Sequence, residues 1–332
     1  MSTATVVDLR SDTVTPPSAA KPRDQVAAEV GDDVYDEDPT VNRLQSACAE
    51  RLGFEAGLFV ASGTQSNLAA LLTHCGRGDE YIAGQMAHTY RFEGGGAAVF
   101  GGIQPQPVPF EGDGTLDLEA VAAAIKPDDF HFARTRLLCL ENTQAGKALP
   151  LPYLADAKAL AEREGLALHL DGARLFNAAI AQGVPAAEIA GHFDTVSVCL
   201  SKGLGAPVGS VLCGSAVFID EARRWRKVLG GGMRQAGVLA AAGLFALEHN
   251  VERLAEDHQR AQALASALAS HGLNVTCHTN MVFVEDIPTT RMLQVMGAGG
   301  VLVSGSRWVV HLDIDDADIK HAADAASALL EG

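Results

Sequence analysis

The chain has 332 residues, of which 48% are hydrophobic and 20% charged, a composition typical of a globular protein with a large core. The length favours one large domain together with a smaller one. The formal net charge of −16 argues against nucleic acid or an anionic membrane as the main partner, although it leaves room for a local basic pocket that binds a small anion.

The N-terminal residues and the cysteines bear on the compartment. MSTATVVDLRSDT lacks the basic start and apolar core of a signal peptide. The longest apolar run, at 236–247, is too short to span a bilayer and predicts a buried helix. Six scattered cysteines without a CxxC pair favour free, buried thiols. We therefore expect a cytoplasmic protein that uses no membrane.

From about residue 56, apolar β-rich runs alternate with alanine-rich helical segments. Helices are predicted at 66–75 and 154–165, and strands at 57–61, 80–84, 103–110, 135–141, 166–171, 195–200 and 208–214. This alternation is typical of βαβ units, and non-alternating runs such as TVSVCL fit a sheet buried on both faces. The sequence therefore predicts an α/β fold with a mostly parallel sheet covered by helices.

Beyond Gly232 the pattern changes. Residues 234–271 favour helix, 274–285 and 307–314 are expected to be strands, and the last residues form a closing helix. We predict a large domain over 1–247, which includes the N-terminal segment, and a smaller α+β domain over 248–332.

The segment FVASGTQSN, at 59–67, predicts a strand, a glycine turn and a helix start. Ser62, Gly63 and Thr64 would place N–H groups and hydroxyls at a helix N-terminus, where a phosphate is stabilised. An ordinary helix cap explains the same residues. The sequence contains no GxxxxGK[ST] motif and therefore gives no support for a nucleoside triphosphate site. It also contains no HExxH motif that would predict a metal site.

Two charged residues follow predicted buried strands. Asp171, in LALHLDGARLFNAA, needs a cationic partner, and a protonated pyridine nitrogen would serve, with Arg174 nearby. A structural Asp–Arg pair is the alternative. Lys202, in CLSKGLGAPVGS, is either a solvated loop cation or a desolvated, nucleophilic amine. A phosphate turn, an aspartate and a lysine, in this order, together predict a pyridoxal phosphate site.

The sequence resembles the low-specificity L-threonine aldolases, which are fold-type I, aspartate-aminotransferase-like pyridoxal phosphate enzymes. The resemblance runs from about residue 7 to 315 and rests on DLRSDTVTPP, VGDDVYDEDPTVNRLQ, FVASGTQSN, AHTYRFEGGGAAVFGGIQPQPV, DDFHFARTRLLCLENT, LHLDGARLFNA, CLSKGLGAPVGS, WRKVLGGGMRQAG and RWVVHLDI. It implies that Lys202 bonds covalently to the cofactor, that Asp171 pairs with the ring nitrogen, that Gly63 and Thr64 hold the phosphate, and that His88 stacks on the ring.

The resemblance also implies a substrate site. Ser11, Arg174 and Arg307 are similar to the family's carboxylate-binding set, and a guanidinium suits a carboxylate. His131, in DDFHFART, matches a histidine near the substrate's β-hydroxyl, which without the resemblance would be interpreted as a surface residue.

Other residues are implied to act across a subunit boundary. Lys227 and Arg234, in WRKVLGGGMRQ, resemble residues that reach a neighbouring subunit's cofactor, and Tyr35 is placed similarly. We therefore expect a homo-oligomer of at least two subunits, with a homotetramer as the expected form and the active sites at subunit interfaces.

The sequence departs from the family pattern in three places. Gln144 replaces the histidine of the family's usual ENTH, and Asp36 replaces the glycine that usually precedes EDPT. Residues 19–25 replace a stretch that usually contains Met-Arg. Because glutamine does not titrate near neutral pH, any acid–base role of position 144 is lost. These departures bear on substrate preference and rate more than on reaction type.

The reaction implied is cleavage of L-threonine, L-allo-threonine and related β-hydroxy-α-amino acids to glycine and an aldehyde. The carboxylate-binding set would hold the Cα–Cβ bond perpendicular to the cofactor ring. His88, His131 or a water, in this order of preference, would remove the β-hydroxyl proton. The alternatives are another fold-type I lyase or racemase, and a non-catalytic relative that binds a small molecule.

Overall fold

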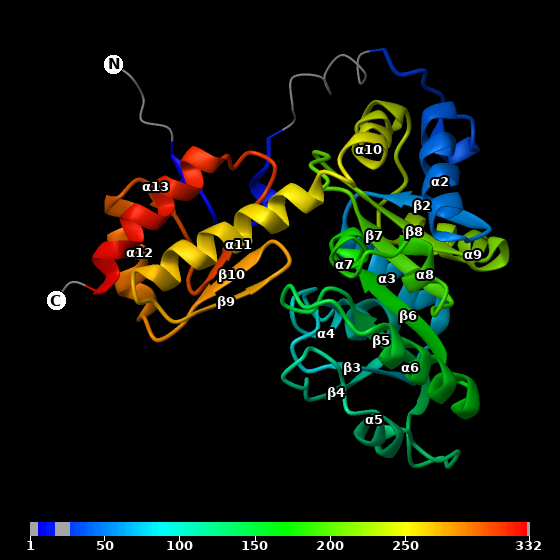
Figure 1. Cartoon of the computed structure of the whole chain (residues 1–332). Helices are drawn as coiled ribbons and strands as arrows, with labels where there is room; N and C mark the ends of the chain where they lie inside the picture. The colour runs from blue at the N-terminus through cyan, green and yellow to red at the C-terminus, as the bar shows by residue number, and fades with distance from the viewer. Residues whose placement is uncertain (1–5, 17–26, 331–332) are drawn as a thin grey trace.

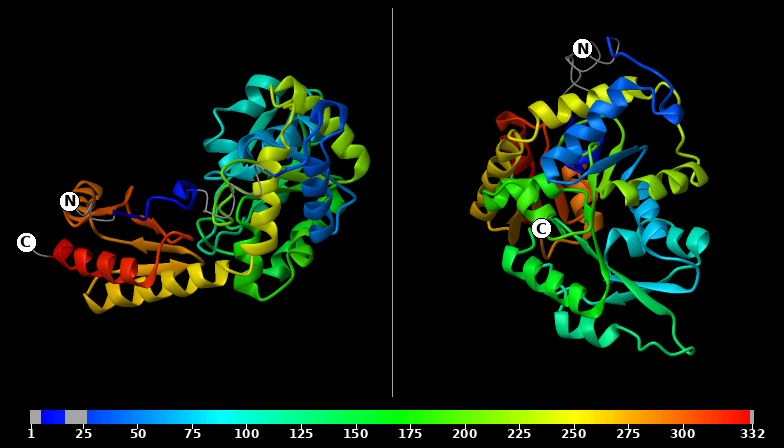
Figure 2. Two further views of the ribbon diagram at one scale, coloured as in Figure 1. Left: turned by 90° about the horizontal axis from the view of Figure 1, so that it is seen from above. Right: turned by 90° about the vertical axis from the view of Figure 1, so that its right-hand side faces the viewer.

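The computed structural model describes residues 6–16 and 27–330, which form a large and a small body joined by helix α11 (Leu254–Ser270) (Figure 1). The view from above in Figure 2 shows α11 leading from the large body into the small one. The departure at residues 19–25 lies outside the described residues. Every helix of the described part is too short or too polar to cross a bilayer.

The large body is built on a seven-stranded sheet. Its order is β2-β8-β7-β6-β5-β3-β4, and every neighbouring pair is parallel except the two that involve β8. The strands are β2 (Ala56–Val60), β3 (Asp79–Gly84), β4 (Gln104–Val108), β5 (Arg134–Glu141), β6 (Ala167–Gly172), β7 (Thr195–Cys199) and β8 (Ser210–Gly214). The prediction of a mostly parallel α/β sheet is confirmed. β8 is antiparallel because the connection from β7 is too short for a helical crossover.

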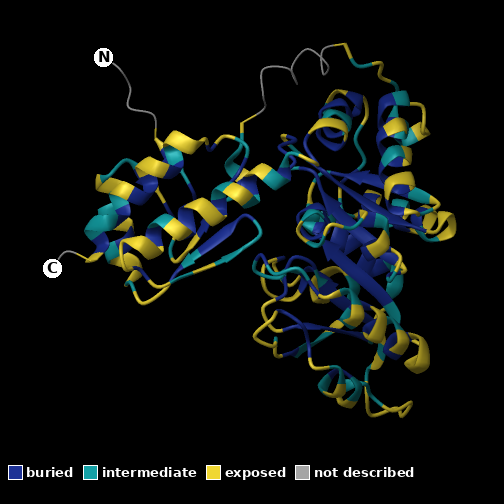
Figure 3. Ribbon diagram, viewed as in Figure 1, coloured by how far each residue is buried: buried dark blue, intermediate teal, exposed yellow. Residues whose placement is uncertain are grey.

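Helices cover this sheet on both faces. They are α2 (Pro39–Leu52), α3 (Gly63–His74), α4 (His88–Arg91), α5 (Leu118–Ala124), α6 (Leu151–Glu164), α7 (Leu175–Gln182), α8 (Ala186–Ala190), α9 (Ala216–Val228) and α10 (Gly237–His249). The central strands are buried while the outer faces of the helices are exposed (Figure 3). Every residue of β7 and β8 is buried, as the non-alternating apolar pattern predicts.

The small body combines two sheets with three helices. β12 (Arg307–Val309), β10 (Met281–Val284) and β9 (Val275–His278) form an antiparallel sheet, covered by α11, α12 (Thr289–Ala298) and α13 (Asp316–Ala326). The stretch predicted as one strand over 274–285 is thus a hairpin, which turns at Thr279 with a φ of 49°. The strand predicted over 307–314 is limited to its first three residues.

The N-terminal segment belongs to the small body. β1 (Val7–Asp8) pairs in parallel with β11 (Val301–Leu302), and Leu9 lies in the core that contains Trp308. Our assignment of these N-terminal residues to the large domain is therefore wrong, because their partner strand lies near the other end of the chain. The division at 247/248 stays a prediction.

Candidate active site

The predicted charged residues meet at one edge of the large sheet. Glu141 is the last residue of β5 and Asp171 the last but one of β6; the two are paired in the ladder, and Lys202 follows β7. His88 opens α4, just after β3. The carboxyl ends of parallel strands meet at this edge, which is where open α/β sheets place their sites.

Asp171 is buried with both carboxylate oxygens satisfied. Its Oδ2 accepts a hydrogen bond of 2.8 Å from Asn67 Nδ2, and its Oδ1 accepts one of 3.1 Å from the Ala173 N–H. These donors support a buried negative charge, as a cationic ring nitrogen requires of its partner.

Lys202 is partly buried, and none of the described residues holds its amine through a hydrogen bond or ion pair. Asp12, His88 and Glu141 lie close enough for the lysine's charge to influence their pKa values. An amine that is surrounded by titrating groups yet unpaired is free to form a covalent bond.

His88 is held at two points. Its backbone N–H donates to Glu141 Oε2 over 2.8 Å, and its Nδ1 lies 2.9 Å from Glu93 Oε1. The hydrogen bond to Glu93 raises the pKa of His88, burial opposes this, and the charge of Asp171 adds to the rise. Because Nδ1 serves Glu93, Nε2 is the ring nitrogen available to other groups.

Two carboxylates of this edge were missed from the sequence. Burial raises the pKa of Glu93 and of Glu141, and Asp171 raises both further. His88, Glu93 and Asp171 bring ligand-type atoms within 4.8 Å of one another, but the hydrogen bonds to His88 and Asn67 account for this grouping. Both glutamates stand inside the segments that carry the family resemblance, which is the only signal that could have found them.

The predicted phosphate turn forms as expected. Ser62 is the N-cap of α3, where its Oγ accepts from the Gln65 N–H over 3.1 Å, and Gly63 and Thr64 open the first turn. The first N–H groups of a helix have no intrahelical acceptor, so these residues can donate to an anion. The turn, the unpaired amine and the supported carboxylate suit the phosphate, aldehyde and ring nitrogen of pyridoxal phosphate.

The carboxylate-binding set gathers around Arg174. Its Nε and Nη2 bond to the two oxygens of the buried Asp12 over 2.9 and 2.6 Å. Burial opposes ionisation of Asp12, but the Arg174 guanidinium prevails and lowers the pKa of Asp12 to about 2. Ser11 directly precedes Asp12 in the chain. Asn280 Nδ2 lies 3.5 Å from Asp12 Oδ2.

Arg307, at the start of β12, approaches the same group from the small body. Desolvation lowers the pKa of Arg307, the charge of Arg174 lowers it further, and Asp12 opposes both. Arg174 and Asp12 thus lie within electrostatic range of Arg307.

His131 is not brought to this edge within one chain. It lies on an exposed loop, with Nδ1 2.6 Å from Asp129 Oδ1, beside Phe130, which is 92% exposed. No other predicted site residue of the described ranges contacts it through a hydrogen bond or ion pair. Its catalytic role stays a prediction.

Tyr35, Lys227 and Arg234 are exposed at a second place. Arg234 pairs with Asp32 over 2.9 Å, so the two segments that carry these residues lie together. The loop after α9 also touches the phosphate turn, because Gln65 Nε2 donates to Leu229 O over 3.5 Å. Their predicted roles toward a neighbouring subunit stay predictions.

Two departures from the family pattern have clear surroundings. Asp36 has a φ of 64°, in the left-handed region that favours glycine, which explains why a glycine is usual there. Gln144 forms a two-way backbone bridge with Lys147, and its side chain packs beside Gly114.

Comparisons with known proteins show which family the chain belongs to. The model of the beta-eliminating lyase family matches residues 8–287. The low specificity L-threonine aldolase of Escherichia coli (strain K12) is 53% identical over 96% of this chain and 97% of its own. A threonine aldolase structure from Leishmania major has a TM-score of 0.79 at 22% identity, covering 97% of this chain and 98% of its own. Serine palmitoyltransferase from S. paucimobilis with bound PLP has a TM-score of 0.75 at 18% identity, covering 98% and 86%.

The chain has the fold of the fold-type I pyridoxal phosphate enzymes, and the groups at this edge of the sheet suit that cofactor. The chain belongs to the beta-eliminating lyase family, and within it is similar to the low-specificity L-threonine aldolases.

Proposed function

We propose that the chain is a lyase that uses pyridoxal phosphate to cleave L-threonine, L-allo-threonine and related β-hydroxy-α-amino acids to glycine and an aldehyde. The observation that carries the proposal is the meeting of three groups at one sheet edge: the unpaired amine of Lys202, the supported carboxylate of Asp171 and the oriented guanidinium of Arg174. Identity of 53% to a threonine aldolase over nearly the whole chain supports it.

Pyridoxal phosphate supplies an electron-withdrawing ring that accepts the electron pair of the broken Cα–Cβ bond. We assign three groups of the cofactor to five positions of this chain. Ser62, Gly63 and Thr64 would hold the phosphate, and Lys202 would hold the aldehyde carbon. Asp171 would keep a proton on the ring nitrogen, because its charge is sustained by the donors from Asn67 and Ala173.

Arg174 would bind the substrate carboxylate. Asp12 occupies its Nε and one hydrogen of Nη2, which leaves Nη1 directed elsewhere. Arg307 and Ser11 would complete the carboxylate site. Fixing the carboxylate and the amino group together sets the orientation of the bond to be broken.

His88 would take the proton of the β-hydroxyl. Its Nδ1 is engaged by Glu93, so the proton would move to Nε2, and the Glu93 carboxylate would stabilise the imidazolium that forms. His131 and a water remain the second and third candidates, since His131 lies on a separate exposed loop.

We further propose a cytoplasmic homotetramer with active sites at subunit interfaces and a part in glycine metabolism. The exposed positions of Tyr35, Lys227 and Arg234 support this, since they leave these side chains free to reach a second subunit. Exposed apolar side chains near α4 are consistent with a covered surface: Met86, Tyr90, Phe92, Val99 and Phe100. Light scattering after gel filtration would give the subunit number.

The direct test is acetaldehyde release from L-threonine and from L-allo-threonine by the protein loaded with pyridoxal phosphate. We expect release from at least one, and a loss of at least about a thousandfold in Lys202→Ala. Borohydride should label wild-type Lys202, while Lys320→Ala, at an exposed helix position, should behave as wild type. Loaded protein that releases no acetaldehyde from either substrate would contradict the proposal.

A further inference from the structure

A line of polar side chains, buried except for the partly buried His74 at its end, leads away from Asp171 into the large body. Asn67 and His74 are seven residues apart on α3, and therefore lie on one face of the helix. His169 lies on β6, two residues before Asp171, and is paired in the ladder with Thr195 of β7. About 10 Å of α3 separates Asn67 from His74. The line therefore runs from the carboxyl ends of the parallel strands toward their amino ends.

The contacts in this line are continuous. Asn67 Nδ2 is 2.8 Å from both Asp171 Oδ2 and Glu93 Oε1. Asn67 Oδ1 is 3.3 Å from His169 Nε2, and His169 Nδ1 is 2.8 Å from Thr195 Oγ1. His74 Nε2 then contacts the same hydroxyl over 2.8 Å.

The two carboxylates fix the direction of every bond. Ionised carboxylates only accept, so both hydrogens of the Asn67 amide face them and its Oδ1 faces His169. His169 must therefore carry its hydrogen on Nε2 and accept at Nδ1, which requires the Thr195 hydroxyl to donate to it. With its hydrogen used, Thr195 accepts from His74 Nε2–H.

Both histidines are neutral, as this pattern requires. Burial and the nearby His74 together lower the pKa of His169 to about 3, against a backbone hydrogen bond at Thr195 that raises it. Burial also lowers the pKa of His74 to about 4, against the opposing charge of Asp194. Each ring thus has one donor and one acceptor, and every hydrogen bond from His74 to the carboxylates donates in the same direction.

We propose that Asn67, His169, Thr195 and His74 form a positioning relay that fixes one amide on two carboxylates, Asp171 beside the cofactor ring and Glu93 beside His88. This role rests on the proposed cofactor site. Through Asn67, the relay joins the group that holds the ring-nitrogen proton to the group that holds the imidazole. Thr195 is itself buried at the start of β7, near the far end of this line from Asp171.

His169 offers a matched pair of variants. His169→Gln keeps a donor for Asn67 and an acceptor for Thr195, whereas His169→Leu keeps neither, although both shorten the same buried side chain. Two properties of pyridoxal phosphate are measured on each variant. They are its dissociation constant from the protein and the pH midpoint at which the absorbance of the bound cofactor changes. Without the His169 donor the Asn67 amide is held less firmly on Asp171, so Asp171 becomes more basic and the pH midpoint of the bound cofactor's absorbance change moves upward.

We expect His169→Leu to raise the midpoint by at least about 0.5 pH unit and to weaken cofactor binding about tenfold, while His169→Gln restores most of both. If the His169→Leu variant folds poorly, Thr195→Val and Thr195→Ser make the same comparison. Thr195→Val should shift the pH midpoint of the absorbance change, and Thr195→Ser should not. Equal behaviour of the two members of each pair would overturn the relay.

A nitrogen-15 spectrum of the cofactor-free protein gives an independent readout. The relay requires the Nε2–H form of His169 and of His74 at neutral pH, and the Nδ1–H form at His169 would overturn it. Neither readout needs turnover. A protein with the expected spectra but no acetaldehyde release would contradict the proposed function alone, and an active aldolase with unshifted His169→Leu would contradict the relay alone.

Discussion

Asp12 is the residue through which the N-terminal segment reaches Arg174, the proposed carboxylate-binding group. It is fully buried and bonds Arg174 at two points, so it fixes the plane of the guanidinium. We expect Asp12→Asn to raise the KM for L-threonine at least about tenfold with a smaller change in kcat, because it loosens carboxylate binding. Steady-state kinetics measures this split.

Asp8→Asn is the control, since Asp8 on the same segment pairs with the exposed Arg10 and not with the site. Its KM should stay within about twofold of wild type. An unchanged KM in Asp12→Asn would show that Arg174 keeps its orientation without Asp12.

Sequence reasoning found the residues whose own chemistry is distinctive. Lys202 and Asp171 stand at the ends of apolar runs, and together with the turn at Ser62, Gly63 and Thr64 they predict a cofactor site. Asn67 and Asp12 could not be found in this way, because an asparagine inside a helix or an aspartate near the N-terminus has no local signal. Their importance comes from partners more than 100 residues away along the chain.

At the scale of elements, the turn at Gly146 shows how closely the two bodies approach. Gly146 has a φ of 82°, and Thr279 Oγ1 of the β9–β10 hairpin donates to its carbonyl over 2.9 Å. A Cβ at this position would lie 2.7 Å from His278 O. The sequence shows a glycine here, but not the hairpin that excludes a side chain.

Gly146→Ala is therefore expected to destabilise the protein by about 2–4 kcal/mol, from the left-handed backbone together with the clash. Gly53→Ala is a matched control, because Gly53 has a φ of 79° and open space where its Cβ would be. It should cost only about 1 kcal/mol. Urea unfolding measures both, and equal losses would show that the hairpin moves aside without cost.

The strand predictions failed where tertiary contacts decide. The run at 274–285 is apolar enough to predict one strand, but Thr279 and Asn280 turn it into a hairpin in which Asn280 is fully buried. Asn280 Nδ2 bonds Val310 O over 3.0 Å and approaches Asp12, both distant in sequence. The large sheet was predicted closely because its strands are bounded by local turn residues and buried on both faces.

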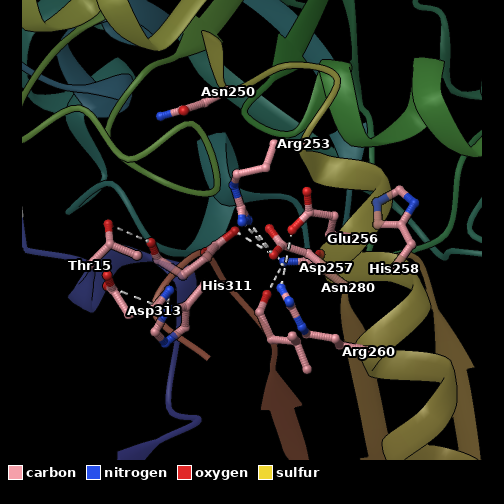
Figure 4. A network of polar contacts seen from close by, with 12 residues as sticks. Thr15, Asn250, Arg253, Glu256, Asp257, His258, Arg260, Asn280, His311 and Asp313 are labelled. Carbon is pink, nitrogen blue, oxygen red and sulfur yellow. Dashed lines mark hydrogen bonds and ion pairs between the residues drawn. The ribbon is translucent and has the colours of Figure 1, made fainter. Parts of the chain in front are cut away.

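At the scale of the whole molecule, polar side chains gather at the start of α11, where the two bodies meet. Figure 4 shows this network, with Arg253 and Asp257 bonded to each other and His258 beside them. His258 extends from α11 to α7, where its Nε2 accepts from Asn177 Nδ2 over 3.1 Å. The contact requires a neutral ring.

Acid should weaken this junction through His258. Burial lowers the pKa of His258 from 6.5 to about 4 in the folded chain, so between these values the unfolded chain binds the proton more readily. The contribution to stability is complete above pH 6.5 and is lost as the pH falls toward 4, by up to about 2–3 kcal/mol.

His258→Gln, measured by urea unfolding at pH 7 and at pH 4.5, should lose less stability over this interval than wild type. His131→Gln, at the exposed loop, should follow wild type, and a parallel response of His258→Gln and wild type would mean that acid acts on the molecule elsewhere.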